Sequence, residues 1–100
     1  MKMKPKKQCH KRYLDVQVQF LANGRMVPTA IIWDDEHHYP IQRVLHIIPQ
    51  AAYGAGGQGD CYTVLIAHGA LIHERRLFFE RSAALSGSEL GRWFVEAAGD

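Results

Sequence analysis

One uninterrupted run of strand-forming residues constrains the fold of this chain more than any other feature. Residues Tyr39–Ile48 form the longest β-branched and apolar stretch in the middle of the sequence, and turn-forming segments bound it on both sides. Apolar side chains occupy both faces of this stretch, since Ile41 and Leu45 share one side while Val44 and Ile48 share the other. Such a pattern is typical of a strand inside a curled sheet or barrel. We therefore expect the other strands to assemble against it.

Other segments predict further strands. Apolar and polar residues alternate from Tyr13 to Phe20, a period of two that is typical of a half-buried strand. Asn23-Gly24 follows as a hairpin signal, because both residues tolerate positive φ. Three more strands are expected at Met26–Trp33, Cys61–Ala67 and Ala70–Glu80.

The register of the last hairpin depends on its turn. If His68-Gly69 is a two-residue turn, Ile66 faces Leu71 and Val64 faces His73. A slip of one residue is the alternative, because sequence alone does not fix strand register.

The segment Pro49–Asp60 is rich in glycine and is predicted to be a mobile loop. Its residues Gly54–Gly59 match the pattern G-x-G-x-x-G. A dinucleotide site needs this pattern to open a helix, whereas here it leads into a strand. A kinase-like glycine loop needs a lysine further along the chain, and none follows. We therefore predict no cofactor.

The C-terminal segment has two interpretations. Arg92–Ala97 can form a closing strand with Trp93 facing the core, or residues 88–98 can form a helix capped by Ser88. Gly91 disfavours the helix by about 1 kcal/mol relative to alanine, and a lone helix would leave the last barrel edge open. We favour the strand.

The order of these landmarks resembles a known group. The Asn-Gly turn, Ile31–Asp34, Arg43–Leu45, Leu77–Glu80 and Arg92–Glu96 follow one another as in small bacterial proteins of unassigned function with an SH3-like β-barrel. The similarity covers roughly residues 13–97, and the long Ser82–Gly91 connection departs from it. The resemblance implies an SH3-like fold and carries no catalytic residues.

Length and charge complete the fold expectation. The 100 residues and 47% hydrophobic content suit one domain. Residues 1–12 hold half of the twelve basic residues and no acid, whereas residues 13–100 hold six basic and ten acidic residues. We expect an all-β chain, with residues 1–12 a flexible, disordered basic arm. Residues 13–100 should form a single, partly open, SH3-like antiparallel barrel of five to six strands.

Localisation follows from the apolar and cysteine content. No apolar run approaches the roughly 18 residues that span a bilayer, so no membrane association is expected. The two cysteines do not form a disulfide framework, and no signal peptide is recognised. We therefore expect a cytoplasmic protein.

Candidate binding residues come from charge and aromaticity. The basic arm suits nonspecific attraction to phosphate, although it can equally serve solubility. Phe78 and Phe79 are consecutive on a strand, so one should point outward as a stacking or docking surface. The mobile loop adds an aromatic side chain. The candidate binding residues are Lys2, Lys4, Lys6, Lys7, Lys11, Arg12, Tyr53, Phe78 and Phe79.

Catalytic and metal signals are weak. Asp34–His38 holds five potential metal ligands, but adjacent side chains of an extended chain point in opposite directions, so we interpret it as a solvated turn and predict no metal. No serine or cysteine is placed to pair with His46, His68 or His73, and Cys61 is interpreted as a small core residue. A metal-dependent enzyme using this turn is the least favoured alternative.

The sequence therefore predicts a non-catalytic binding or assembly module, not an enzyme. A protein partner or self-association is favoured. Nucleic-acid binding through the basic arm and an exposed aromatic side chain is the second hypothesis.

Overall fold

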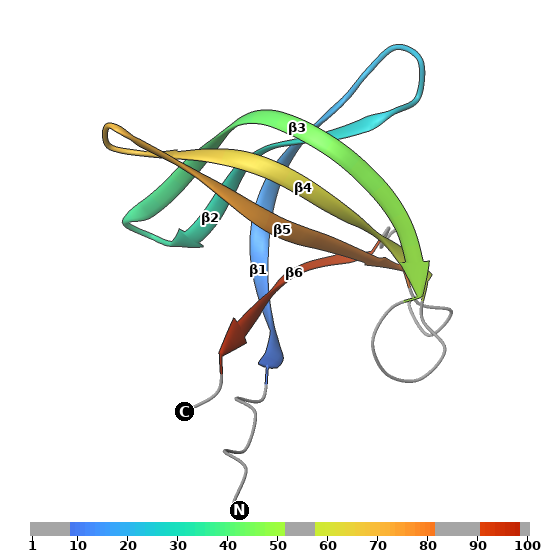
Figure 1. Cartoon of the computed structure of the whole chain (residues 1–100). Helices are drawn as coiled ribbons and strands as arrows, with labels where there is room; N and C mark the ends of the chain where they lie inside the picture. The colour runs from blue at the N-terminus through green and yellow to red at the C-terminus, as the bar shows by residue number, and fades with distance from the viewer. Residues whose placement is uncertain (1–8, 52–57, 82–90, 99–100) are drawn as a thin grey trace, which may run out of the picture.

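The chain folds into an all-β barrel. The computed structural model describes residues 9–51, 58–81 and 91–98, and no helix occurs among them. Strands β1 to β6 pair in chain order, and β6 returns to β1, so that the antiparallel barrel is closed (Figure 1). The strands are β1 Cys9–Phe20, β2 Met26–Asp34, β3 His37–Ala51, β4 Gln58–His68, β5 Leu71–Arg81 and β6 Arg92–Ala98. The described residues contain no helical segment suited by length and apolarity to cross a membrane.

β1 pairs with two different strands along its length. Its first half pairs with β6, from Cys9 opposite Ala98 to Leu14 opposite Trp93, and its second half pairs with β2. The strand therefore begins at Cys9, four positions before Tyr13, where the sequence suggested that order would start. The predicted arm boundary at residue 12 is thus too late, because pairing with β6 makes the backbone around Lys11 part of the sheet.

The hairpin between β1 and β2 confirms the predicted turn. Gly24 has a φ of +87°, and its amide N–H donates to the Leu21 carbonyl at 2.9 Å. The side-chain oxygen of Asn23 accepts from the Arg25 amide at 3.0 Å. Pro28 lies beside a register shift in the β1–β2 pairing, a position where a sheet tolerates proline.

The hairpin between β4 and β5 differs from the prediction by two residues. Ile66 faces His73 and Val64 faces Arg75, because Gly69 and Ala70 form the turn and His68 still pairs with Leu71. Gly69 has a φ of +63° at the first central position, where type II′ hairpins require glycine. A shift of two residues keeps every side chain on its predicted face.

The core is centred on β4, β5 and β6 and not on Tyr39–Ile48. Val64 and Leu77 are fully buried, whereas β3 contributes only partly buried side chains such as Val44. Two register shifts between β3 and β4 interrupt the alternation of β3 and leave Leu45 and Ile48 exposed. The main core cluster is Ile31, Tyr62, Val64, Ile66, Leu77, Phe79 and Trp93.

The C-terminal segment is the predicted strand and not the alternative helix among its described residues. β6 pairs with β1 along Trp93–Ala98 and with β5 at three positions, Arg92 to Phe94. Trp93 points into the main core, as expected.

β3 is longer than predicted, and β4 starts earlier. β3 continues to Ala51 and β4 begins at Gln58, so much of the predicted loop Pro49–Asp60 is strand. Gly59 is buried within β4, where a Cβ atom would lie 2.1 Å from the Phe79 carbonyl oxygen. Glycine is therefore required at position 59, because the backbone of β5 approaches too closely for a side chain.

Replacing Gly59 with alanine should lower the free energy of unfolding by about 2 kcal/mol, because the backbone of β5 must move away from the new methyl group. Gly59 lies near the start of β4, so the ladder can open locally. Chemical denaturation measures the change. Gly24→Ala is the control, since open space surrounds it and only its positive φ costs about 1 kcal/mol. Equal losses would contradict the steric argument.

Candidate functional site

The predicted binding residues do not form one site. Lys2, Lys4, Lys6, Lys7 and Tyr53 lie outside the described residues. Lys11 and Arg12 are consecutive on β1, so their side chains leave opposite faces of the strand. Lys11 approaches the ring of Phe94, whereas Arg12 lies over the ring of Trp33. The two side chains therefore contact two separate regions of the barrel.

Phe78 and Phe79 do not provide an exposed aromatic surface. They lie on opposite faces of β5, as alternation predicts, yet their exposed fractions are 3% and 5%. Phe79 packs in the main core against Trp93, and Phe78 stacks on Phe94 with ring centroids 4.9 Å apart. The prediction of an outward aromatic from this pair is wrong, because the second face of the sheet is also covered.

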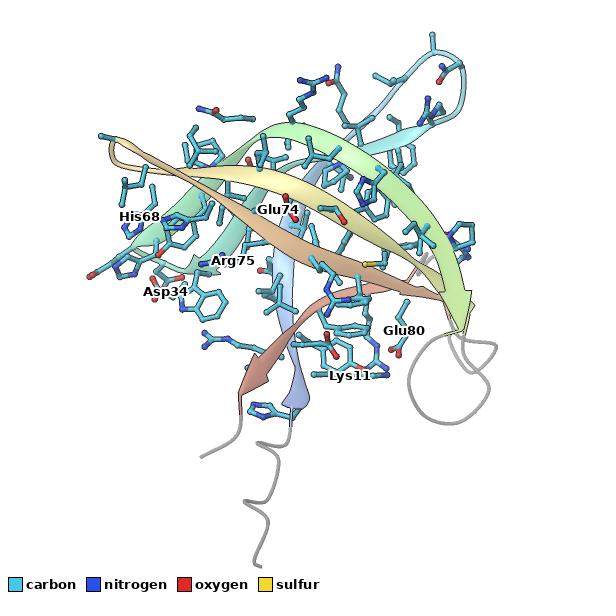
Figure 2. The ribbon with its side chains drawn as sticks, viewed as in Figure 1. Lys11, Asp34, His68, Glu74, Arg75 and Glu80 are labelled. Atoms are coloured by element: carbon cyan, nitrogen blue, oxygen red, sulfur yellow. The ribbon has the colours of Figure 1, made fainter. Side chains whose placement is uncertain are left out.

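Lys11 belongs to an ionic network around a buried carboxylate. Glu80 is 5% exposed, and its carboxylate accepts from the Lys11 ammonium, from the Tyr13 hydroxyl at 2.9 Å and from the Arg92 guanidinium at 3.0 Å (Figure 2). These groups come from β5, β1 and β6. The network therefore ties three strands together, and Lys11 contributes to the fold.

The histidine-rich turn is organised by Asp34. Its carboxylate accepts the backbone N–H groups of Glu36 and His37 at 2.9 Å and lies 2.7 Å from the His37 ring nitrogen. The Glu36 amide is the main cause, and the His37 ring the next, of a lowered pKa for Asp34. Asp34 thus acts as the acceptor of the β2–β3 turn. In residues 9–51, 58–81 and 91–98, no group of three or more potential ligands is arranged to hold a metal ion.

A cavity of about 610 Å³ opens where β5 and β6 separate. β5 pairs with β4 along its whole length but with β6 only from Phe78 to Glu80. The remaining part of β5 diverges from β6, and the ends of β2, β3 and β4 contribute to the cavity between them (Figure 1). Its lining is Ile31, Trp33, Tyr39, Ile66, His68, His73, Arg75, Arg76, Val95 and Glu96. We call it the β5–β6 cavity.

Aromatic and imidazole rings form a connected row in this lining. Tyr39 meets His68 edge to face with ring centroids 5.3 Å apart, and His68 lies 6.2 Å from His73. Trp33 lines the cavity, while the Arg12 guanidinium covers its ring at 3.6 Å from the centroid. Because Arg12 is not part of the lining, the cavity meets the part of the indole that Arg12 leaves uncovered. The site thus offers planar apolar surfaces.

The charge of the β5–β6 cavity is predominantly positive. Arg76 is paired with Glu96 at 3.4 Å. By contrast, no described carboxylate lies within ion-pair distance of Arg75 or Arg12. In Figure 2, Arg75 and His68 lie at the same end of the barrel as Asp34, whose carboxylate accepts hydrogen bonds from its own turn. Arg75 is therefore the lining guanidinium without a described carboxylate partner, and Arg12 is a second such group outside the lining.

The described lining offers no nucleophile for covalent catalysis. It includes two histidines but no serine, threonine, cysteine or lysine. Cys61 is buried on the other face of the sheet, and burial raises the pKa of its thiol. A buried thiol with a raised pKa is a poor nucleophile at neutral pH. The cavity has the features of a binding site: moderate volume, planar rings and a few charged groups.

Comparison with known proteins adds no relative. No family model, no curated protein and no solved structure matches this chain. The assignment of the site therefore rests on its geometry.

Sequence reasoning missed the lining as a group. Trp33, Tyr39, His68, His73 and Arg75 come from four strands, β2 to β5, and no local motif joins them. The spacing of His73 and Arg75, two positions apart on one strand, indicated a shared face. That spacing did not reveal that β5 leaves β6 at this point.

Proposed function

We propose that this protein is a non-catalytic binding module and that its ligand enters the β5–β6 cavity. The observation that carries the proposal is a 610 Å³ cavity that combines aromatic rings with an unneutralised guanidinium. This volume lies within the range of about 300–1,000 Å³ that is usual for ligand sites. The absence of a nucleophile from the described lining supports binding over catalysis.

We also propose that the barrel is SH3-like and that the chain is related to the small bacterial proteins it resembles. The mouths of β-barrels are among the preferred places for ligand sites. We also propose a cytoplasmic location, since a buried free thiol at Cys61 suits a reducing compartment.

A macromolecular partner is supported by the surroundings of the cavity. Leu71 and Ile72 are exposed at the tip of the β4–β5 hairpin, next to the cavity residues His68 and His73. Exposed apolar side chains beside a polar recognition site are typical of docking surfaces. We propose a protein partner or a second copy of the chain as one class of occupant.

The proposal can be tested with anilinonaphthalene sulfonate, an aromatic anion whose fluorescence rises in apolar sites. We expect saturable binding at one site of the folded protein, weakened about tenfold in Arg75→Gln by the loss of one charge-assisted contact. Arg43→Gln is the matched control, because Arg43 is exposed on β3 and outside the cavity lining. Equal binding by all three proteins, or none, would reject the cavity as a ligand site.

A turnover assay addresses the non-catalytic part of the proposal. We expect no hydrolysis of nitrophenyl esters or phosphates above background. Turnover that is abolished by His73→Ala, in a protein with an unchanged melting temperature, would show that the module is an enzyme.

Nucleic-acid binding is the second candidate function. Two observations favour it: Arg12 and Arg75 lack described carboxylate partners, and the aromatic rings of Trp33 and Tyr39 line the same cavity as Arg75. Cationic grooves with aromatic side chains are the usual means of binding single strands. The alternative of a metal-dependent enzyme finds no support in the described turn, where Asp34 is occupied by hydrogen bonds.

A further inference from the structure

We propose that the β5–β6 cavity binds a nucleotide. The base stacks against the rings of Trp33 and Tyr39, and the phosphate pairs with Arg75. The nucleotide can be free or one unit of a single-stranded nucleic acid, because both present the same base and phosphate. This inference rests on the proposed function, since it names the ligand class of that same site.

The charges favour an anion over a cation or a neutral ligand. Arg75 lines the cavity, and its side chain donates to the carbonyl of Glu74 at 2.9 Å and to no described carboxylate. Figure 2 shows Glu74 on the other side of β5 from Arg75. The carboxylate next in sequence therefore does not neutralise the cavity. A phosphate would supply the bidentate acceptor that this guanidinium lacks.

The rings favour a planar group beside that anion. The Arg12 guanidinium covers the Trp33 indole from one side, and the ring of Tyr39 contacts the rings of His37 and His68. Side chains fixed in this way lose little entropy when a further ring stacks on them. Each base stacked on an aromatic side chain is worth about 1–3 kcal/mol. A base therefore uses the ring surfaces that a simple anion would leave unoccupied.

An acidic peptide fits the site less well. Its carboxylates would pair with Arg75, but the row Tyr39–His68–His73 and the Trp33 surface would meet only backbone or aliphatic groups. A double helix fits less well still, because its bases are stacked on one another and their faces are not available to Trp33. The geometry thus points to an unpaired base.

The first experiment is a fluorescence-anisotropy titration with a labelled oligothymidylate dodecamer, between about 50 and 200 mM salt. Arg75→Gln should weaken binding about tenfold and lower the salt slope by about one, as expected for a lost phosphate contact. Trp33→Leu should also weaken binding about tenfold, provided that its melting temperature shows a folded protein. Arg43→Gln makes the same charge change outside the cavity and should leave the affinity within about twofold.

The charges of the N-terminal arm need their own control. Removing residues 1–12 would delete part of β1 and the Lys11–Glu80 contact, so the full chain should be kept. Replacing Lys2, Lys4, Lys6 and Lys7 with glutamine removes the four lysine charges that precede the described residues. If this variant loses all binding while Arg75→Gln binds like the wild type, the cavity is not the nucleotide site and the inference is overturned.

Calorimetry with thymidine monophosphate and with the dodecamer distinguishes the two sources of the ligand. Binding of the monophosphate that is lost in Arg75→Gln supports a free nucleotide, whereas binding of the dodecamer alone supports a single strand. Binding of the aromatic sulfonate dye without either nucleotide would refute this inference and leave the proposed function standing. Competition by an oligoglutamate peptide without any nucleotide binding would assign the cavity to an acidic protein partner instead.

Discussion

Replacing Phe94 with alanine should lower the free energy of unfolding by about 4 kcal/mol, within the range of about 3–5 kcal/mol for deleting a buried phenylalanine. Phe94 is 1% exposed although it points away from the main core. Its ring stacks on Phe78 at 4.9 Å with an interplanar angle of 6° and meets Tyr13 edge to face at 5.7 Å. Removing it leaves a cavity beneath Lys11, which lies over the same ring.

Guanidinium chloride denaturation measures this loss, and Phe20→Ala provides the control. Phe20 lies at the end of β1 and is 58% exposed, so its truncation should cost less than about 0.5 kcal/mol. If the two variants lose the same stability, the packing around Phe94 is loose. The expected difference would show that Cys61, Phe78 and Phe94 form a second core on the outer face of the sheet.

The second core could not be predicted from the sequence. Alternation places Phe78 and Phe79 on opposite faces, as it places Leu14, Val16 and Val18 on the core side of β1, and the structure confirms both. Alternation says nothing about what covers the outer face. Part of that covering comes from Lys11 and Tyr13 on β1, more than sixty residues away in sequence. Long-range contacts of this kind leave no local signature.

The turns illustrate the same division between local and distant information. The Asn23-Gly24 turn is fixed by its own backbone preferences, and its geometry was predictable. In the β4–β5 hairpin, Gly69 is in the turn as predicted and has a positive φ, but it is the first turn residue and not the second, which shifts the register by two residues. The start of β1 at Cys9 depends on β6, because a basic segment without apolar alternation gains its order from pairing.

The candidate site was the least predictable part. Each ring and charge of the β5–β6 cavity is visible in the sequence, yet the cavity exists because β5 and β6 pair at only three positions. That separation follows from strand twist and from the change of partner along β1, which sequence periodicity does not encode.

The buried carboxylate of Glu80 also stabilises the fold, through its charge and not through apolar packing. Burial alone would raise its pKa, but the hydrogen bonds from Lys11 and Tyr13 and the charges of Lys11 and Arg92 outweigh this effect and hold the pKa below its usual range. A lowered pKa means that the folded state prefers the ionised carboxylate more strongly than the unfolded state does. The ion therefore stabilises the fold.

Replacing Glu80 with alanine should lower the free energy of unfolding by about 3 kcal/mol, the lower end of the range for breaking a buried ion pair. The lower end applies because Lys11 and Arg92 keep some access to water. Denaturant titration measures the change, with Glu74→Ala as the control on the same strand, where the exposed side chain should matter by less than about 0.5 kcal/mol. Equal effects at the two positions would contradict the network.

The pH dependence separates the charge of Glu80 from its packing. Glu80→Gln keeps the shape of the side chain but removes its charge. The stability that the wild type gains from this charge should be complete above the ordinary glutamate pKa, about 4.3 in peptides, and should disappear as the pH falls below it through the lower pKa of the folded protein. The difference in free energy of unfolding between the two proteins should therefore narrow in acid. A difference that stays constant from neutral to acid pH would assign the effect of Glu80 to packing and hydrogen-bond geometry alone.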